Sequence, residues 1–78
     1  MNMKVRILTP SCNRAFEADA VFLPGALAPF EVLLGHAAVI STLEEGSVRW
    51  REAGKEESFG IKGGVMRFAD DEMTICAE

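Results

Sequence analysis

Residues 24–42 read Pro-Gly-Ala-Leu-Ala-Pro-Phe-Glu-Val-Leu-Leu-Gly-His-Ala-Ala-Val-Ile-Ser-Thr, and this stretch decides how the chain folds. It holds two of the three prolines, two of the seven glycines and the only histidine. Pro24-Gly25 ends one apolar run, and the small, apolar residues that follow form a loop. The pattern then predicts a short strand over 30–34, a turn at Gly35-His36 and a second strand over 37–43.

Period-2 alternation continues on both sides of this stretch. At the start of the chain, Lys4 and Arg6 alternate with Val5 and Ile7, which is typical of a half-buried strand. The predicted strands are 3–8, 16–23, 30–34, 37–43, 47–52, 57–61, 65–68 and 72–77. Turn residues separate them, and no window shows a helical stripe. The sequence therefore predicts an all-β fold, a two-sheet β-sandwich or flattened barrel of about 8–10 short strands, as a single domain over 1–78.

Aromatic residues recur at inward positions of these strands. The predicted aromatic core consists of Phe16, Phe22, Trp50, Phe59 and Phe68. Alternation places Trp50 on the face opposite to Arg49 and Arg51, so these three residues do not form one surface for single-stranded nucleic acid.

Composition excludes several classes of function. The chain has twelve acidic and eight basic residues, a net charge of −4 and no basic patch, which argues against nucleic-acid binding. Cys12 and Cys76 lie far apart, and with a single histidine they match no metal-ligand spacing, so we expect free thiols, no metal and no cofactor. The first residues show no charged-then-apolar pattern, so we expect no secretion. No run approaches the about 20 apolar residues of a transmembrane helix, so membrane association would come through another protein.

No group of residues predicts catalysis. His36 is the only ring that could act in acid–base chemistry near neutral pH, yet no nucleophile motif accompanies it. The acidic stretch 70–72 lacks the spacing of a calcium loop, and Lys62-Gly63-Gly64 lacks the remainder of a phosphate loop. We expect His36 to be structural or to contact a partner, and the chain not to be an enzyme.

The loop at Leu27, Pro29 and Phe30 allows two interpretations. It either packs back onto the sandwich as an Ω-like loop or remains exposed as an apolar contact patch. An apolar patch needs a cover, and a partner protein would provide one.

Taken in order, these motifs resemble the N-terminal β-sandwich domain of the epsilon subunit of F-type ATP synthases. Residues 30–37 read Phe-Glu-Val-Leu-Leu-Gly-His-Ala, where the family typically has Phe-Gly-Val-Leu-Pro-Gly-His-Ala. Further matches are Leu8-Thr9-Pro10, residues 16–21 leading into Pro24-Gly25, Leu43 to Val48, Gly63-Gly64-Val65 and residues 73–78. The chain departs from the family at Pro29, where an acidic residue is usual, and at Leu34, where a proline is usual.

The resemblance implies a non-catalytic subunit of the central stalk, or rotor. Such a subunit links the gamma subunit to the ring of c subunits and so couples ion transport to ATP synthesis. It would be a peripheral subunit on the cytoplasmic face of the plasma (inner) membrane. Because the sequence stops at Glu78, where the sandwich ends, we expect the inhibitory C-terminal helical hairpin of many members to be absent.

The resemblance also implies the contact residues. Candidates for binding gamma or the c-ring are Thr9, Leu27, Ala28, Pro29, Phe30, His36 and Ser41. We expect Phe30 and His36 to lie on the outer surface at one end of the sandwich. The alternative function is a free-standing small β-sandwich that binds a ligand or acts as an adaptor.

Overall fold

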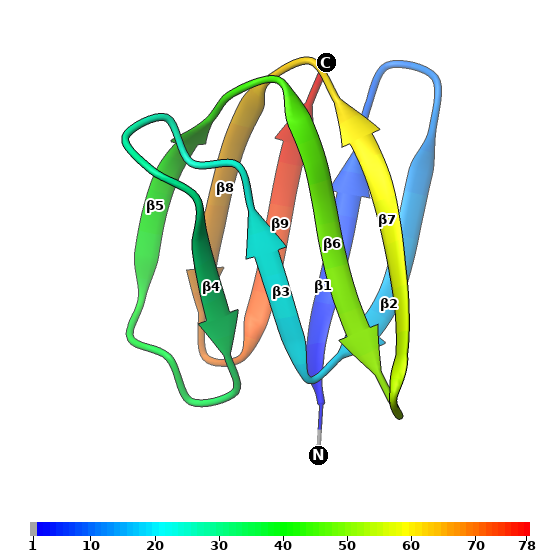
Figure 1. Cartoon of the computed structure of the whole chain (residues 1–78), viewed down its shortest axis with the longest axis vertical. Coiled ribbons are helices and arrows are strands. Elements are labelled where there is room, and N and C mark those ends of the chain that lie inside the picture. The colour runs from blue at the N-terminus through cyan, green and yellow to red at the C-terminus, as the bar shows by residue number, and fades with distance from the viewer. Residues whose placement is uncertain (1) are drawn as a thin grey trace.

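The computed structural model describes residues 2–78, which form nine β-strands in two sheets (Figure 1). The strands are β1 (Met3–Leu8), β2 (Asn13–Ala18), β3 (Ala20–Leu23), β4 (Phe30–Leu33), β5 (Val39–Leu43), β6 (Gly46–Glu52), β7 (Lys55–Ile61), β8 (Gly64–Ala69) and β9 (Glu72–Ala77). No helix occurs within this part of the chain. The predicted β-sandwich is confirmed.

The sheets have five and four strands. The five-stranded sheet has the order β2-β1-β9-β8-β5, and the four-stranded sheet has the order β4-β3-β6-β7. All neighbouring strands are antiparallel except β1 and β9, which pair in parallel at the centre of the larger sheet. The first and last strands therefore lie side by side, as Figure 1 shows in blue and red.

The core lies between the sheets and is made of the inward residues of each strand. Its largest fully buried side chains include Trp50, Phe68, Met3, Ile7, Met66, Met73 and Ile75. Outward residues alternate with them, and no buried polar or charged residue occurs among those described. Burial of apolar area at roughly 25 cal/mol per Å² is the main term that holds the two sheets together.

The single strand predicted over 16–23 is wrong, because the chain changes sheet at Asp19. Up to Ala18 it belongs to the five-stranded sheet, and from Ala20 it belongs to the four-stranded sheet. The Asp19 N–H donates to the carbonyl of Arg51 at 2.9 Å. The change of sheet inverts which residues point inward, since Ala18 is buried before the break while Val21 and Leu23 are buried after it.

This inversion also corrects the predicted aromatic core. Trp50 and Phe68 are buried, and Phe16 and Phe59 pack against the core while partly exposed. Phe22 instead lies on the outer face of the four-stranded sheet. There the guanidinium groups of Arg49 and Arg51 lie over its ring, at 4.9 and 5.7 Å from the centroid.

Two sets of side chains close one open side of the sandwich. Phe16 of β2 stacks on Trp50 of β6 with ring centroids 4.0 Å apart and planes at 19°. Arg14 covers the same Trp50 ring and the ring of Phe59, at 5.2 and 5.8 Å. On the other open side, the edge strands β4 and β5 face each other without pairing, and this is where the predicted contact loop lies.

Candidate partner-binding surface

The loop between β3 and β4 is fixed to the far sheet by its backbone. The Ala26 N–H donates to the carbonyl of Thr42, and the Glu44 N–H donates to the carbonyl of Pro24, at 3.0 and 2.8 Å. Gly25 also forms an isolated β-bridge with Leu43. A loop that starts in the four-stranded sheet is thereby held against the end of β5 in the five-stranded sheet (Figure 1).

Gly25 allows this loop to pack closely on Phe30. A β-carbon at position 25 would lie 2.8 Å from two carbons of the Phe30 ring, which is closer than real β-carbons approach other atoms. The Phe30 ring is half-buried and packs against the core. Phe30 therefore fits the first interpretation of the loop, in which part of it packs back onto the sandwich.

The rest of the loop fits the second interpretation. Ala26, Leu27, Ala28 and Pro29 are exposed, and the Leu27 side chain is 103% exposed. An isolated exposed leucine is ordinary on a protein surface, but here a run of small apolar residues surrounds it. The loop thus combines a half-buried anchor, Phe30, with an exposed apolar tip.

The surface formed by the loop tip extends onto the neighbouring strand β5. A hollow of about 410 Å³ is lined by the loop and by residues 39–42 of β5. Ile40 points outward from β5 and is 72% exposed, while Ser41 is half-buried and its hydroxyl donates to the carbonyl of Thr42 at 3.0 Å. We call this surface the loop–β5 patch, and it consists of Leu27, Ala28, Pro29, Phe30, Ile40 and Ser41.

A second hollow lies on the other side of the loop. It measures about 570 Å³ and shares Pro29 and Phe30 with the first. Its remaining lining includes Phe22, Glu31 and Arg49 from the outer face of the four-stranded sheet. The loop therefore stands between two concave regions, one mainly apolar and one with charged side chains.

His36 lies at the opposite end of β4 from Phe30, so the expectation that both residues share one end of the sandwich is wrong. The His36 N–H donates to the carbonyl of Leu33 at 3.0 Å, closing a turn after β4. Its ring meets the Phe68 ring edge-on at 6.0 Å, and Nδ1 lies 2.7 Å from the carbonyl oxygen of Ala37. The length of β4 therefore separates His36 from the loop–β5 patch.

Thr9 lies apart from both. It follows β1, and both its N–H and its hydroxyl donate to the carbonyl of Cys12, at 2.8 and 3.1 Å. The connection leads into β2, which is the edge of the five-stranded sheet farthest from β5. The structure thus brings together Leu27, Ala28, Pro29, Phe30 and Ser41, and it separates Thr9 and His36 from them.

Ile40 is the member of the loop–β5 patch that the sequence alone did not single out. Alternation within β5 places Val39 and Ser41 inward and Ile40 and Thr42 outward. The sequence did contain an indication of its exposure, because alternation puts an isoleucine on the outward face of β5, where a polar residue is usual.

Residues 2–78 form neither a metal site nor a membrane-spanning helix. No three His, Cys, Asp or Glu side chains there lie close enough to hold a metal ion. In the same range, no helix has the length and apolarity needed to cross a membrane.

Comparison with known proteins gives a family match over residues 2–78, to the family described as ATP synthase, Delta/Epsilon chain, beta-sandwich domain. An ATP synthase epsilon chain of Desulfitobacterium hafniense is 35% identical over 75 residues, covering 95% of this chain and 57% of the relative. One of Caulobacter vibrioides is 39% identical over 62 residues, covering 80% and 72%. The chain therefore spans little more than half the length of several curated relatives.

Solved structures share the fold. A chain in the central stalk and c-ring of the Tetrahymena thermophila mitochondrial ATP synthase matches with a TM-score of 0.80 at 19% identity, over 99% of this chain and 63% of that one. A chain of the Euglena gracilis mitochondrial ATP synthase matches with a TM-score of 0.88 at 19% identity, over 97% and 50%.

Proposed function

Because the chain belongs to the delta/epsilon β-sandwich family of ATP synthases, we propose that it is a rotor subunit of an F-type ATP synthase. In this role it links the gamma subunit to the c-ring and makes or breaks no covalent bond itself. The observation that carries the proposal is the family match, which extends over every residue that the structure describes. Torque from the ring would pass to gamma through a junction that this sandwich stiffens.

The architecture suits a part that must not deform under load. The core is continuous between two sheets, and the loop, the Phe16–Trp50 stack and the Gly35–Asp71 hydrogen bond each join elements of different sheets. Packed interiors transmit strain because they have few voids and low compressibility. A rigid sandwich therefore keeps two partner surfaces at a fixed separation.

The candidate contact residues lie at three separate places, which suits a subunit that holds two partners. The loop–β5 patch presents exposed apolar area around Leu27 and Ile40, which association would remove from water. His36 lies at the other end of β4, and Thr9 lies beside the far edge of the larger sheet. In the assembled rotor, these separate positions would allow gamma and the c-ring to be contacted simultaneously.

In this role the chain is a peripheral subunit held at the cytoplasmic face of the plasma membrane by its partners. Its attachment would depend on the complex. Loss of either partner contact would release it to the soluble fraction.

The proposal is tested by purifying the tagged full chain from detergent-solubilised membranes of the cells that make it. We expect gamma and c subunits to copurify. The Leu27→Asp variant places a charge in the loop–β5 patch at a fully exposed position, so recovery of the partners falls while the unfolding free energy changes by less than about 0.5 kcal/mol. Phe30 would be a poorer probe, because its ring also packs against the core.

The matched control is Ser58→Asp. It adds the same charge at an exposed position of β7, in the sheet that lacks β5, and should leave recovery unchanged. A wild-type chain that stays a soluble monomer and recovers neither gamma nor c subunits contradicts the proposal. That result favours the alternative of a free-standing ligand-binding or adaptor module.

A further inference from the structure

The outer face of the five-stranded sheet carries a row of polar residues that the proposed rotor contacts do not use. Arg6 of β1 is paired in register with Thr74 of β9, and Thr74 is paired with Arg67 of β8. All three residues alternate with buried neighbours, so they share the outward face. One hydroxyl group thus lies between two arginines on the three central strands of the sheet.

These two arginines differ from the other three in the chain. Arg14 lies over aromatic rings, and Arg49 and Arg51 both cover a ring and reach a carboxylate. Within residues 2–78, no carboxylate lies within 4.0 Å of the guanidinium of Arg6 or Arg67, and neither makes a side-chain hydrogen bond. Their donors remain available to a ligand.

The rows on either side set the local charge. Below the arginine row, Lys4 lies between Glu17 and Glu72, its register partners on β2 and β9. That row carries one positive and two negative charges, so its net charge is −1, and among residues 2–78 Lys4 forms no ion pair within 4.0 Å with either carboxylate. Above the arginine row, the register aligns three uncharged residues, Leu8, Cys76 and Val65. The arginine row is therefore the most positive strip of this face.

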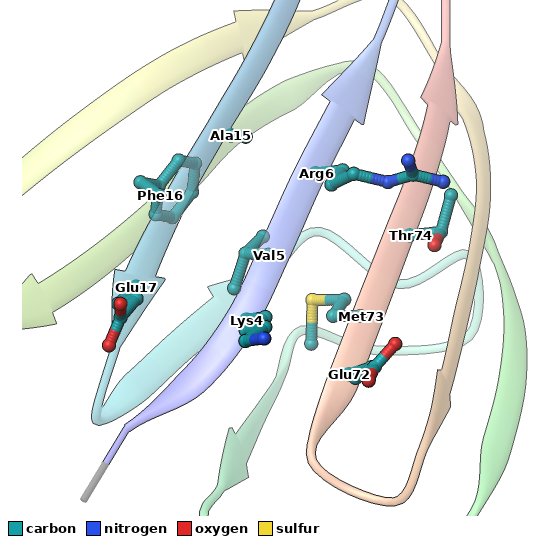
Figure 2. Close-up of a pocket in the computed structure, with 9 residues that line it drawn as sticks. All are labelled: Lys4, Val5, Arg6, Ala15, Phe16, Glu17, Glu72, Met73 and Thr74. Carbon is teal, nitrogen blue, oxygen red and sulfur yellow. The ribbon is translucent and has the colours of Figure 1, made fainter.

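The surface is hollowed on both sides of Thr74. A hollow of about 490 Å³ lies between β2 and β9 and includes Arg6, and one of about 330 Å³ includes Arg67. Thr74 lines both. Figure 2 shows the Arg6 side chain running sideways from β1 across to β9, with its guanidinium group beside Thr74.

From this arrangement we infer that Arg6, Thr74 and Arg67 form a binding site for a phosphate-class oxyanion. Neighbouring strands are about 4.8 Å apart, so an anion above Thr74 is within reach of an arginine on each side. Guanidinium groups bind phosphate through paired N–H donors, and the threonine hydroxyl adds a third point of attachment. A tetrahedral anion with several acceptor oxygens matches donors on three neighbouring strands better than a planar carboxylate does.

The test uses the full chain labelled with ¹⁵N and titrated with inorganic phosphate, with sodium chloride adjusted to hold the ionic strength constant. We expect saturable amide shifts centred on Arg6, Thr74 and Arg67. A parallel titration with acetate should give weaker binding, which separates phosphate-class anions from carboxylates. A phosphorylated metabolite whose phosphate is terminal, such as a nucleoside monophosphate, would bind with the same centre of shifts if the site accepts esters as well as the free ion.

Three variants assign the site to these residues. Arg6→Gln and Arg67→Gln should each weaken phosphate binding about fivefold, and the double variant should abolish saturation. Thr74→Val keeps the shape of the side chain, removes the hydroxyl and should weaken binding about threefold. Arg49→Gln removes one arginine that is also exposed but lies on the other sheet, so it should leave phosphate binding unchanged.

The inference is overturned by shifts that spread equally over all five arginines without saturation, which would mean only diffuse attraction. It is also overturned if Arg6→Gln and Arg49→Gln bind phosphate equally well. Amide spectra of every variant show whether the β-sandwich remains folded, so a loss of binding is interpreted only on a native spectrum. The test does not depend on gamma or c subunits, so its failure would leave the proposed rotor function untouched.

Discussion

The backbone N–H of Gly35 donates a hydrogen bond of 2.8 Å to Oδ1 of Asp71. Gly35 belongs to the β4–β5 connection and Asp71 to the β8–β9 turn. The bond therefore joins the end of the smaller sheet to a turn of the larger one. It lies at the end of the sandwich opposite to the loop that bonds to Thr42 and Leu43.

Replacing Asp71 by alanine should lower the unfolding free energy by about 1–2 kcal/mol. The variant loses the acceptor for Gly35, and it places alanine at a backbone φ of +59°, where residues with a β-carbon are disfavoured. Asp71→Asn keeps an Oδ1 acceptor and tolerates this conformation, so it should cost little. Urea unfolding followed by Trp50 fluorescence measures both, and equal losses for the two variants would contradict the role given to the acceptor.

Gly35→Ala should cost about 1 kcal/mol for a purely conformational reason. Gly35 has φ +82°, and a β-carbon there would meet no atom within 4 Å. Gly60 is the matched control, since a β-carbon would also meet nothing but the backbone is not in the left-handed region. Gly60→Ala should stay within about 0.5 kcal/mol of wild type. If both variants unfold at the same urea concentration, the turn does not require a glycine.

Gly25→Ala should destabilise the chain by about 1–3 kcal/mol, because the added carbon overpacks the Phe30 ring. In a Phe30→Leu background the ring is gone, so the same change at position 25 should cost less. Part of the cost remains, since the carbonyl of Ala28 is also close. Thermal unfolding of the four chains in this cycle measures the difference, and strictly additive costs would show that the two residues are not in contact.

The Phe16–Trp50 stack should carry a coupling free energy of about 0.5–1.5 kcal/mol beyond the loss of apolar area. A double-mutant cycle of Phe16→Leu and Trp50→Leu measures it by urea unfolding monitored by circular dichroism. Phe59→Leu paired with Phe16→Leu serves as the comparison, because within residues 2–78 the Phe16 ring stacks on Trp50 and forms no ring pair with Phe59. A coupling near zero for the first pair would mean that the rings contribute only through their buried area.

Much of the fold followed from the sequence because two-residue periodicity is strong in a thin sandwich. Strands such as Met3–Leu8 and Glu72–Ala77 bury one face fully, so their alternation is almost complete. The failure at Asp19 has a physical cause. The chain changes sheet within an extended run that contains no Gly or Pro to mark a break. The only sign in the sequence is that the buried side switches between Ala18 and Val21.

Part of the candidate surface could also be predicted from the local sequence. Loop composition identified Leu27 to Phe30, since apolar residues outside a strand need some cover. The placement of His36 depended on the direction of β4, which local sequence does not encode. A strand of four residues is long enough to carry Phe30 and His36 to opposite ends of the sandwich.

The parallel pairing of β1 with β9 has a consequence for how the chain folds. The two strands are separated in the sequence by the seven strands β2 to β8, so that pairing closes a loop that contains all seven. Folding rates fall as contacts become less local, and all-β domains of this kind fold in roughly milliseconds to seconds. During synthesis, β1 leaves the ribosome long before its parallel neighbour exists. One whole edge of β1 therefore stays unpaired until β9 has emerged, and an unpaired strand edge of this kind is a template for aggregation.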